Sequence, residues 1–201
     1  NDGTFSEASD ISRGAFAKGV YNAAKFTPDT SCGDFPDVPP THEFYTEITT
    51  LKCLDIIHGY SDGTFRPEVS LLRDQSTKFV TNTLVALGAI ESAEACAAGV
   101  TQFPDVPTDS LFYDDIRCVK GLGIFAGFSD GTFRPEEAVS RGQAAKILTG
   151  GRSVLYYSRW NLNSSLECAL IDPAAGIYTG NTVDVICNLS GTNNLYGAQL
   201  T

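Results

Sequence analysis

Apolar side chains recur at helical spacing in two segments of the chain, each followed by a glycine-containing loop. They are Phe44, Ile48, Leu51 and Leu54 in the earlier segment and Phe112, Ile116, Val119 and Leu122 in the later one. This spacing predicts two helices that each bury one face. Gly59 and Gly127 end these helices, and the Asp-Gly pairs at 62–63 and 130–131 predict tight turns.

A second set of helices is expected to start after the loops. Ser12-Arg13 and Ser140-Arg141 open two of them, because a serine hydroxyl accepts a hydrogen bond from a free N–H of the first turn. Apolar residues again keep helical spacing: Phe16, Val20 and Ala24 in one, and Ala144, Ile147 and Leu148 in the other. A third helix of this set is expected to start at Leu72-Arg73, where leucine replaces the serine. The cap of this helix is therefore expected to be lost or moved.

A first helix, a glycine loop and a second helix together form a unit that repeats along the chain. Residues 35–78 and 103–146 align without a gap at an offset of 68, and both contain Phe-Pro-Asp-Val-Pro and Ser-Asp-Gly-Thr-Phe-Arg-Pro. Residues 2–18 match the end of the repeat at an offset of 60, so this copy lacks its front half. We therefore expect modules at 1–30 (truncated), 31–90 and 91–150.

The composition changes after the third copy. Strand-forming residues cluster at 154–157, 167–171 and 182–187 between turn residues, which predicts a small β unit over 151–201. Cys168 and Cys187 lie in this tail and are expected to form one disulfide. The predicted fold class is thus mainly α, with a small disulfide-stapled β unit at the C-terminus.

Four further cysteines lie within the repeats. Six cysteines without a Cys-x-x-Cys pair indicate disulfides in an oxidising compartment and not a metal site. Pairing Cys32 with Cys53 and Cys96 with Cys118 closes one loop of similar length in each copy, and this symmetry favours it. The pairings 32–96 with 53–118, and 32–118 with 53–96, remain open alternatives.

Charge and motifs limit the function classes. The formal net charge of −10 argues against a nucleic-acid partner, which would require a basic face. The chain contains no run of 18 apolar residues, so no membrane-spanning helix is predicted. The absence of methionine suggests a processed, exported chain. No nucleophile–base set or metal-ligand cluster is recognisable, so we expect neither an enzyme nor a cofactor or metal.

Phe-x-Asp-Val, a helix, Gly-Tyr-x-Asp-Gly-Thr-Phe-Arg-Pro, and Ser-Arg opening a second helix together resemble the S-layer homology module. The resemblance covers about residues 1–150. It implies three modules around a pseudo-threefold axis, with grooves between neighbours, that attach exported proteins to cell-wall polysaccharide, which often carries acidic groups. The resemblance therefore implies a secreted, cell-surface location.

The resemblance also suggests ligand-binding residues at the helix starts, where free N–H groups attract anions and an arginine adds a bidentate donor. The expected ligand contacts are Ser12, Arg13, Tyr60, Arg73, Phe128, Ser140 and Arg141. The family usually has Thr-Arg-Ala-Glu here. Ser140-Arg-Gly-Gln143 resembles a variant of it and predicts the best-preserved site. Asp74 beside Arg73 is expected to repel an anion and to weaken the second site.

Two functions follow from this reading. The first is a non-catalytic structural protein of the S-layer type that binds cell-wall polysaccharide. The alternative is a subunit of an extracellular filament or sheath, in which the repeats serve as contacts for self-association. Saturable, arginine-dependent binding would indicate the first, and large assemblies without polysaccharide the second.

Overall fold

The structure is a computed structural model that describes residues 5–163, 165–170 and 185–190. The chain divides into two compact units, Asn1–Leu155 and Tyr156–Thr201. The first unit is helical, as the sequence predicts. None of the helices in the described ranges combines the length and the hydropathy that a membrane crossing needs.

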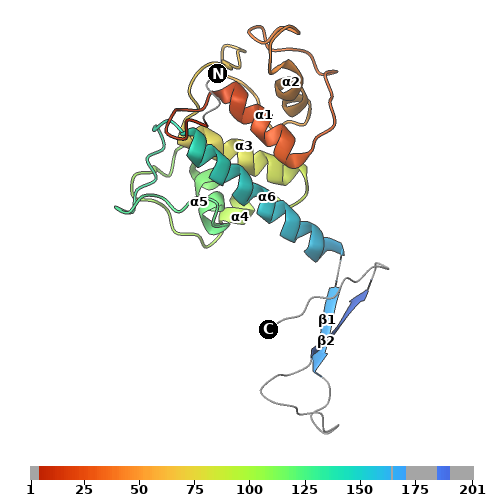
Figure 1. The fold of residues 1–201 in the computed structure, drawn as a ribbon. Helices are drawn as coiled ribbons and strands as arrows, with labels where there is room; N and C mark the ends of the chain where they lie inside the picture. Colours follow the sequence, from red (N-terminus) through yellow and green to blue (C-terminus); the bar gives the residue numbers. More distant parts are fainter. Residues whose placement is uncertain (1–4, 164, 171–184, 191–201) are drawn as a thin grey trace. The chain divides into compact units, whose positions relative to one another are not determined.

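Six helices are described: α1 (Arg13–Ala24), α2 (Tyr45–Cys53), α3 (Arg73–Ala86), α4 (Ala93–Ala97), α5 (Tyr113–Gly121) and α6 (Arg141–Asn163). In Figure 1, α1, α3 and α6 lie side by side, and each is the second helix of one repeat copy. The first helices of the two full copies pack outside them, α2 against α1 and α5 against α3. The short helix α4, which the sequence analysis did not anticipate, packs on α5.

A ring of backbone hydrogen bonds joins the three copies just ahead of α1, α3 and α6. The N–H of Ile11 donates to the carbonyl of Val139, Val139 to Leu71, and Leu71 back to Ile11, at 2.9, 2.8 and 2.9 Å. The side chains of all three residues are buried. The ring repeats one contact three times, once ahead of each of the three helices.

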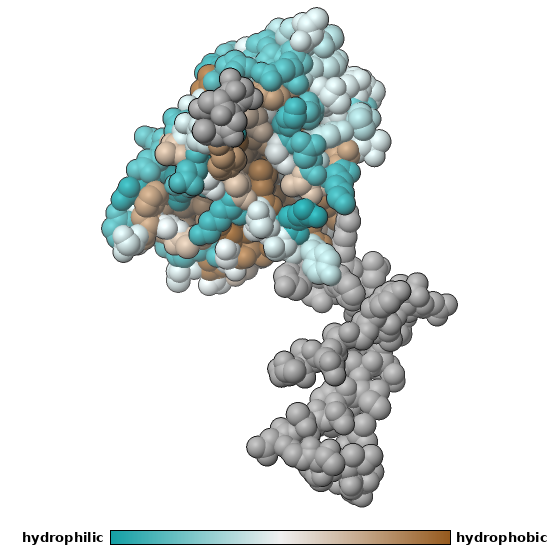
Figure 2. Space-filling model, viewed as in Figure 1, coloured by the Kyte–Doolittle hydropathy of each residue, from teal (hydrophilic) through white to brown (hydrophobic). Residues whose placement is uncertain are grey.

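Phenylalanine side chains from different copies share one core. Phe16 of α1 meets Phe79 of α3 edge to face at 5.6 Å between ring centres, and Phe79 also contacts Phe65. Phe65 and Phe133, one from each glycine loop, are fully buried, so each loop places an apolar ring in the core. On the face viewed in Figure 2, some hydrophobic surface remains uncovered in the middle, bordered by hydrophilic side chains.

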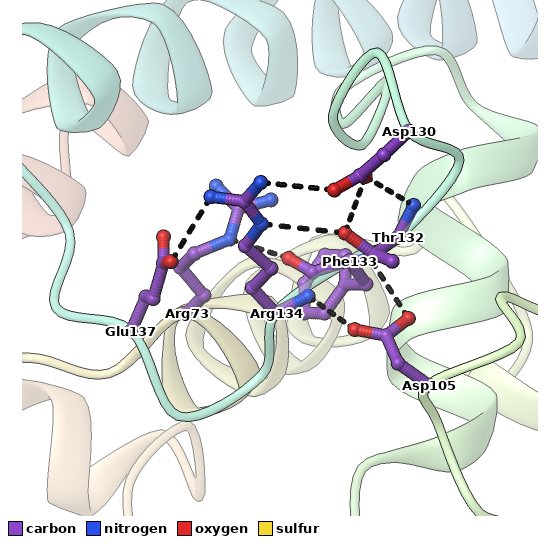
Figure 3. A network of polar contacts seen from close by, with 7 residues as sticks. All are labelled: Arg73, Asp105, Asp130, Thr132, Phe133, Arg134 and Glu137. Atoms are coloured by element: carbon purple, nitrogen blue, oxygen red, sulfur yellow. Dashed lines mark hydrogen bonds and ion pairs between the residues drawn. The ribbon is translucent and has the colours of Figure 1, made fainter.

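An aspartate fixes each glycine loop from a distance in sequence. The Asp37 carboxylate accepts from the N–H groups of Phe65 and Arg66 at 2.8 and 2.6 Å. Asp105 makes the same pair of bonds to Phe133 and Arg134 (Figure 3). Arg66 and Arg134 both have φ near +60°, a left-handed backbone that non-glycine residues seldom adopt. The aspartate bonds therefore hold a conformation that the loop sequence alone disfavours.

The disulfides Cys32–Cys53 and Cys96–Cys118 confirm the pairing that the repeat symmetry favoured. Their Cα atoms lie 5.3 and 5.0 Å apart. The first links the segment before α2 to the last residue of α2, and the second links α4 to α5. The two bonds therefore hold α2 and α5 to the segments that precede them.

Removing the second disulfide tests its contribution to stability. We expect Cys96→Ser with Cys118→Ser to lower the free energy of unfolding by about 3 kcal/mol, because the unfolded chain regains the entropy of an open loop. Urea denaturation of the oxidised proteins measures this difference. Under a strong thiol reductant, which opens the disulfides of both proteins, the wild-type and double-serine proteins should unfold at about the same urea concentration.

The expected strand at 154–157 is wrong, because α6 continues through it to Asn163. Val154 and Leu155 pack against the helical core, and this burial outweighs their preference for strands. Beyond α6, the antiparallel strands β1 (Ser165–Leu170) and β2 (Val185–Ser190) place Cys168 opposite Cys187 in register. The rest of the expected β unit lies outside the described residues, so the unit and its disulfide stay predictions.

Candidate functional site

Each of the three helix-opening arginines binds the glycine loop of the next copy. Arg13 Nε donates to the carbonyl of Phe65 at 3.0 Å, and Arg73 Nε to that of Phe133 at 2.7 Å (Figure 3). Arg141 Nε closes the circle by donating to Phe5 in the first copy at 2.9 Å. The arginines therefore connect neighbouring modules, a role that the analysis of single copies did not predict.

The predicted aromatic residues lie beside arginines of the preceding copy. The guanidinium of Arg13 lies 4.8 Å from the ring centre of Tyr60, and that of Arg73 lies 4.7 Å from Phe128. A second arginine approaches each ring, Arg66 at 4.1 Å and Arg134 at 3.9 Å. The predicted arginines thus lie at three separate sites: Arg13 with Tyr60, Arg73 with Phe128, and Arg141 with Phe5, a residue that the sequence analysis did not predict.

The place around Arg13 opens into a groove of about 470 Å³. Its lining combines cationic, polar and apolar side chains: Arg13, Ile56, Ile57, His58, Gly59, Tyr60, Ser61, Gln75, Lys78, Phe79, Leu111 and Phe112. Residues from all three copies contribute: α1 supplies Arg13, α3 supplies Gln75 and Lys78, and the segment before α5 supplies Leu111. We call this space the Arg13 groove.

The polar groups of the Arg13 groove form one connected set. Arg13 Nη1 donates to Gln75 Oε1 at 3.0 Å, and Gln75 Nε2 donates to the Tyr60 hydroxyl at 3.3 Å. Leu111, which is 85% exposed, lies on the wall of the groove. The arrangement offers hydrogen-bonding groups on its floor and apolar surface at its edge, a combination that suits a ligand with polar edges and apolar faces.

The charge of Arg13 is buried without a carboxylate partner. The residue is only 5% exposed, and burial lowers the pKa of its guanidinium. No ion pair involves it within the described part of the chain. A buried cation is costly unless it is paired, so an anionic ligand group in the groove would relieve this cost.

The two predicted serine ligands serve as helix caps. Ser12 Oγ accepts from the N–H of Ala15, and Ser140 Oγ accepts from that of Gln143, both at 3.2 Å. Gln143 also accepts from the Ser140 N–H at 3.0 Å, which completes a capping box at the start of α6. At Leu72 the cap has moved, because Asp74 Oδ1 accepts from the N–H of Gln75 instead.

Asp74 is the exception among the three helix starts, where its counterparts are Gly14 and Gly142. Burial, followed by the nearby charge of Glu136, raises the pKa of Asp74 to about 6, whereas it is near 4 in an unfolded chain. The native state therefore binds more protons than the unfolded state between these values. Stability should fall as the pH rises from about 4 to about 6.

The isosteric substitution Asp74→Asn tests this account of the carboxylate. At pH 7.5 we expect the free energy of unfolding to rise by about 1 kcal/mol, a value reduced for partial exposure to solvent. At pH 4 the gain should largely vanish, because wild-type Asp74 is then protonated in the native state. Urea titrations of both proteins at the two pH values measure it, and an equal gain at both would contradict the assignment.

Several residues of the Arg13 groove were not predicted as ligand contacts: Gln75, Lys78, Phe79 and Leu111. Lys78 and Lys146 occupy matching places in the repeat, and this signal was available in the sequence. The position of Leu111 was not, because it depends on how the front of the third copy packs beside α3.

The fold and groove define a class of protein: tandem helix–loop–helix modules joined by arginines, with a groove between modules. Two stretches, residues 34–75 and 102–145, match the family model of the S-layer homology domain. These stretches correspond to the two full copies. The truncated copy at the start lies outside both, so it stays a prediction.

Three relatives share this part of the chain. The surface-layer 125 kDa protein of Lysinibacillus sphaericus is 30% identical over 135 residues, 67% of this chain and 11% of that protein. Cell surface glycoprotein 1 of Acetivibrio thermocellus is 30% identical over 160 residues, which cover 73% of this chain and 7% of that protein. The cellulosome-anchoring protein of the same organism is 26% identical over 114 residues, which cover 57% of this chain and 25% of that protein. The chain therefore spans a quarter or less of each relative's length.

Proposed function

We propose that this chain is a non-catalytic, secreted cell-surface protein whose modules attach it to an acidic cell-wall polysaccharide. The matched domain and the names of the three relatives support a surface and anchoring role. The observation that carries the binding proposal is the buried guanidinium of Arg13, which has no ion-pair partner among the described residues and lines a groove that can hold a sugar.

The Arg13 groove is the proposed principal binding site. Lys78, whose nearest carboxylate is Asp115 at 4.0 Å, adds a second cation that attracts an anionic group. Tyr60 and Gln75 supply hydrogen-bonding groups for sugar hydroxyls, while Phe79, Leu111 and Phe112 supply apolar surface for sugar C–H faces. Arg73 with Phe128, and Arg141 with Ser140, remain proposed contacts of further sites.

Substitution of Leu111 tests the groove with little risk to the fold. We expect Leu111→Glu to weaken binding to purified cell-wall sacculi at least about tenfold, because a new anion on the wall repels an acidic ligand. Glutamate is acceptable here, since the side chain is 85% exposed and the matching position of the second copy is Glu43.

Co-sedimentation over a range of sacculus concentrations measures the effect. The matched control is Val85→Glu, which adds the same charge at an exposed position toward the far end of α3. It should leave binding unchanged. Equal loss in both variants would show a general charge effect and not a site, and no loss in Leu111→Glu would contradict the proposed groove.

Self-association into a filament or sheath is the alternative function. It requires large particles that form from the purified chain without wall material and persist in Leu111→Glu. Light scattering on the same preparations decides between the two. We expect no large particles, because the proposed function requires only that the modules bind the polysaccharide.

A further inference from the structure

The inner helices of the first two copies each hold an acidic helix through a lysine at the same repeat position. Lys18 of α1 pairs with Glu47 of α2 at 3.7 Å, and Lys78 of α3 lies 4.0 Å from Asp115 of α5. Thr81, one turn after Lys78, also donates a hydrogen bond to Asp115. The lysine side of α1 and of α3 is therefore a docking face for a helix with a carboxylate near its start.

Helix α6 carries the same face, and none of the other described helices covers it. Lys146 matches Lys78 and Thr149 matches Thr81 at the repeat offset of 68. Thr77 and Thr81 are fully buried on α3, whereas their counterparts Ala145 and Thr149 on α6 are exposed. Within the described residues, Lys146 has no acidic partner.

A groove of about 430 Å³ lies along this side of α6. It is lined by Gly123, Ile124, Ala145, Lys146, Thr149, Gly150 and Ser153. The α6 residues apart from Lys146 are small, so a neighbouring backbone can approach closely. Figure 1 shows α2 beside α1 and α5 beside α3, the packing that this face of α6 lacks among the described elements.

We propose that the α6 face around Lys146 binds an amphipathic helix of the same kind as α2 and α5, supplied by polypeptide outside residues 1–201. Its carboxylate, at the position of Glu47 and Asp115, pairs with Lys146 and accepts from Thr149. Its apolar residues, matching the buried Ile48 and Ile116, pack on the helices beneath. Helices α2 and α5 are already packed and disulfide-linked, so the described part of a second copy offers no spare helix of this kind.

The proposal can be tested by fusing an extra first helix directly to the start of the chain, with no linker between them. Asp130-Gly-Thr-Phe133 matches Asp2-Gly-Thr-Phe5, so an extra copy of residues 103–128 placed directly before Asn1 continues the repeat in register. The extra copy carries Cys118→Ser, because its disulfide partner is not included. We expect the fusion to raise the thermal midpoint by about 5 °C and to slow amide exchange in α6 at least about tenfold, relative to a fusion with the same residues in scrambled order.

Charge substitutions identify the docking face. Lys146→Glu should remove both effects, and Asp115→Lys in the added segment should restore them by reversing the pair. The matched control Arg152→Glu changes an exposed cation of α6 that lies outside this groove, and it should leave both effects in place. A fusion that behaves like the scrambled one, or effects that survive Lys146→Glu, would overturn the proposal.

Discussion

Phe133→Ala is expected to lower the free energy of unfolding by about 4 kcal/mol, because it leaves a ring-sized cavity in the core. The ring is fully buried and lies 5.3 and 5.5 Å from the ring centres of Phe103 and Phe125. The guanidinium of Arg73 lies 4.7 Å from the same ring, while its Nε bonds the Phe133 carbonyl. The substitution thus loosens the loop, the core and the contact between two modules together.

Urea denaturation of the full chain measures this loss. Phe128→Ala is the matched control, since it removes the same ring five residues earlier in the same loop, where the side chain is only partly buried. It should cost clearly less than Phe133→Ala. Equal losses at the two positions would contradict the assignment of Phe133 as the ring that anchors the loop to the core.

Asp105→Ala is expected to cost about 3 kcal/mol of stability, because two backbone N–H groups lose a charged acceptor. These bonds, of 2.8 Å to Phe133 and 2.6 Å to Arg134, hold the arginine in its left-handed backbone conformation. The loop should then become mobile, with faster amide exchange over residues 127–135 as a second readout.

The exposed Asp109 lies in the same connector and provides the control. Asp109→Ala removes the same charge and makes no change to the loop contacts, so its effect should stay within about 0.5 kcal/mol. If Asp105→Ala is as mild as this control, the aspartate does not hold the loop and the motif needs another explanation.

Local features of this fold could be predicted from sequence, because they depend on residues close together in the chain. Ser12 and Ser140 cap their helices as expected, since capping involves only the first helical turn. The symmetry of the repeat favoured the observed disulfide pairing over two alternatives that the sequence left open. The sequence did not predict the C-terminal part of α6, because Val154 and Leu155 favour strands and only their tertiary packing makes them helical.

The candidate site was harder to predict because it is built between copies. The sequence indicates that Arg13 opens a helix, but it does not show that the helix faces the loop of the next copy with Tyr60 and Phe65. For the same reason, the sequence does not show that Asp37 and Asp105 bind a loop 28 or 29 residues later. Aligning the copies shows which residues are equivalent, and only the three-dimensional arrangement shows which ones meet.

The central claim is that an acidic wall polysaccharide binds in the Arg13 groove. The most direct test is a titration of isotope-labelled protein with acidic oligosaccharides released from purified cell walls, followed by backbone amide shifts in NMR spectra. Our account predicts saturable shifts concentrated at Gly59, Tyr60, Gln75 and Lys78. Shifts centred on Phe5 and Arg141, or no saturable shifts at all, would contradict it.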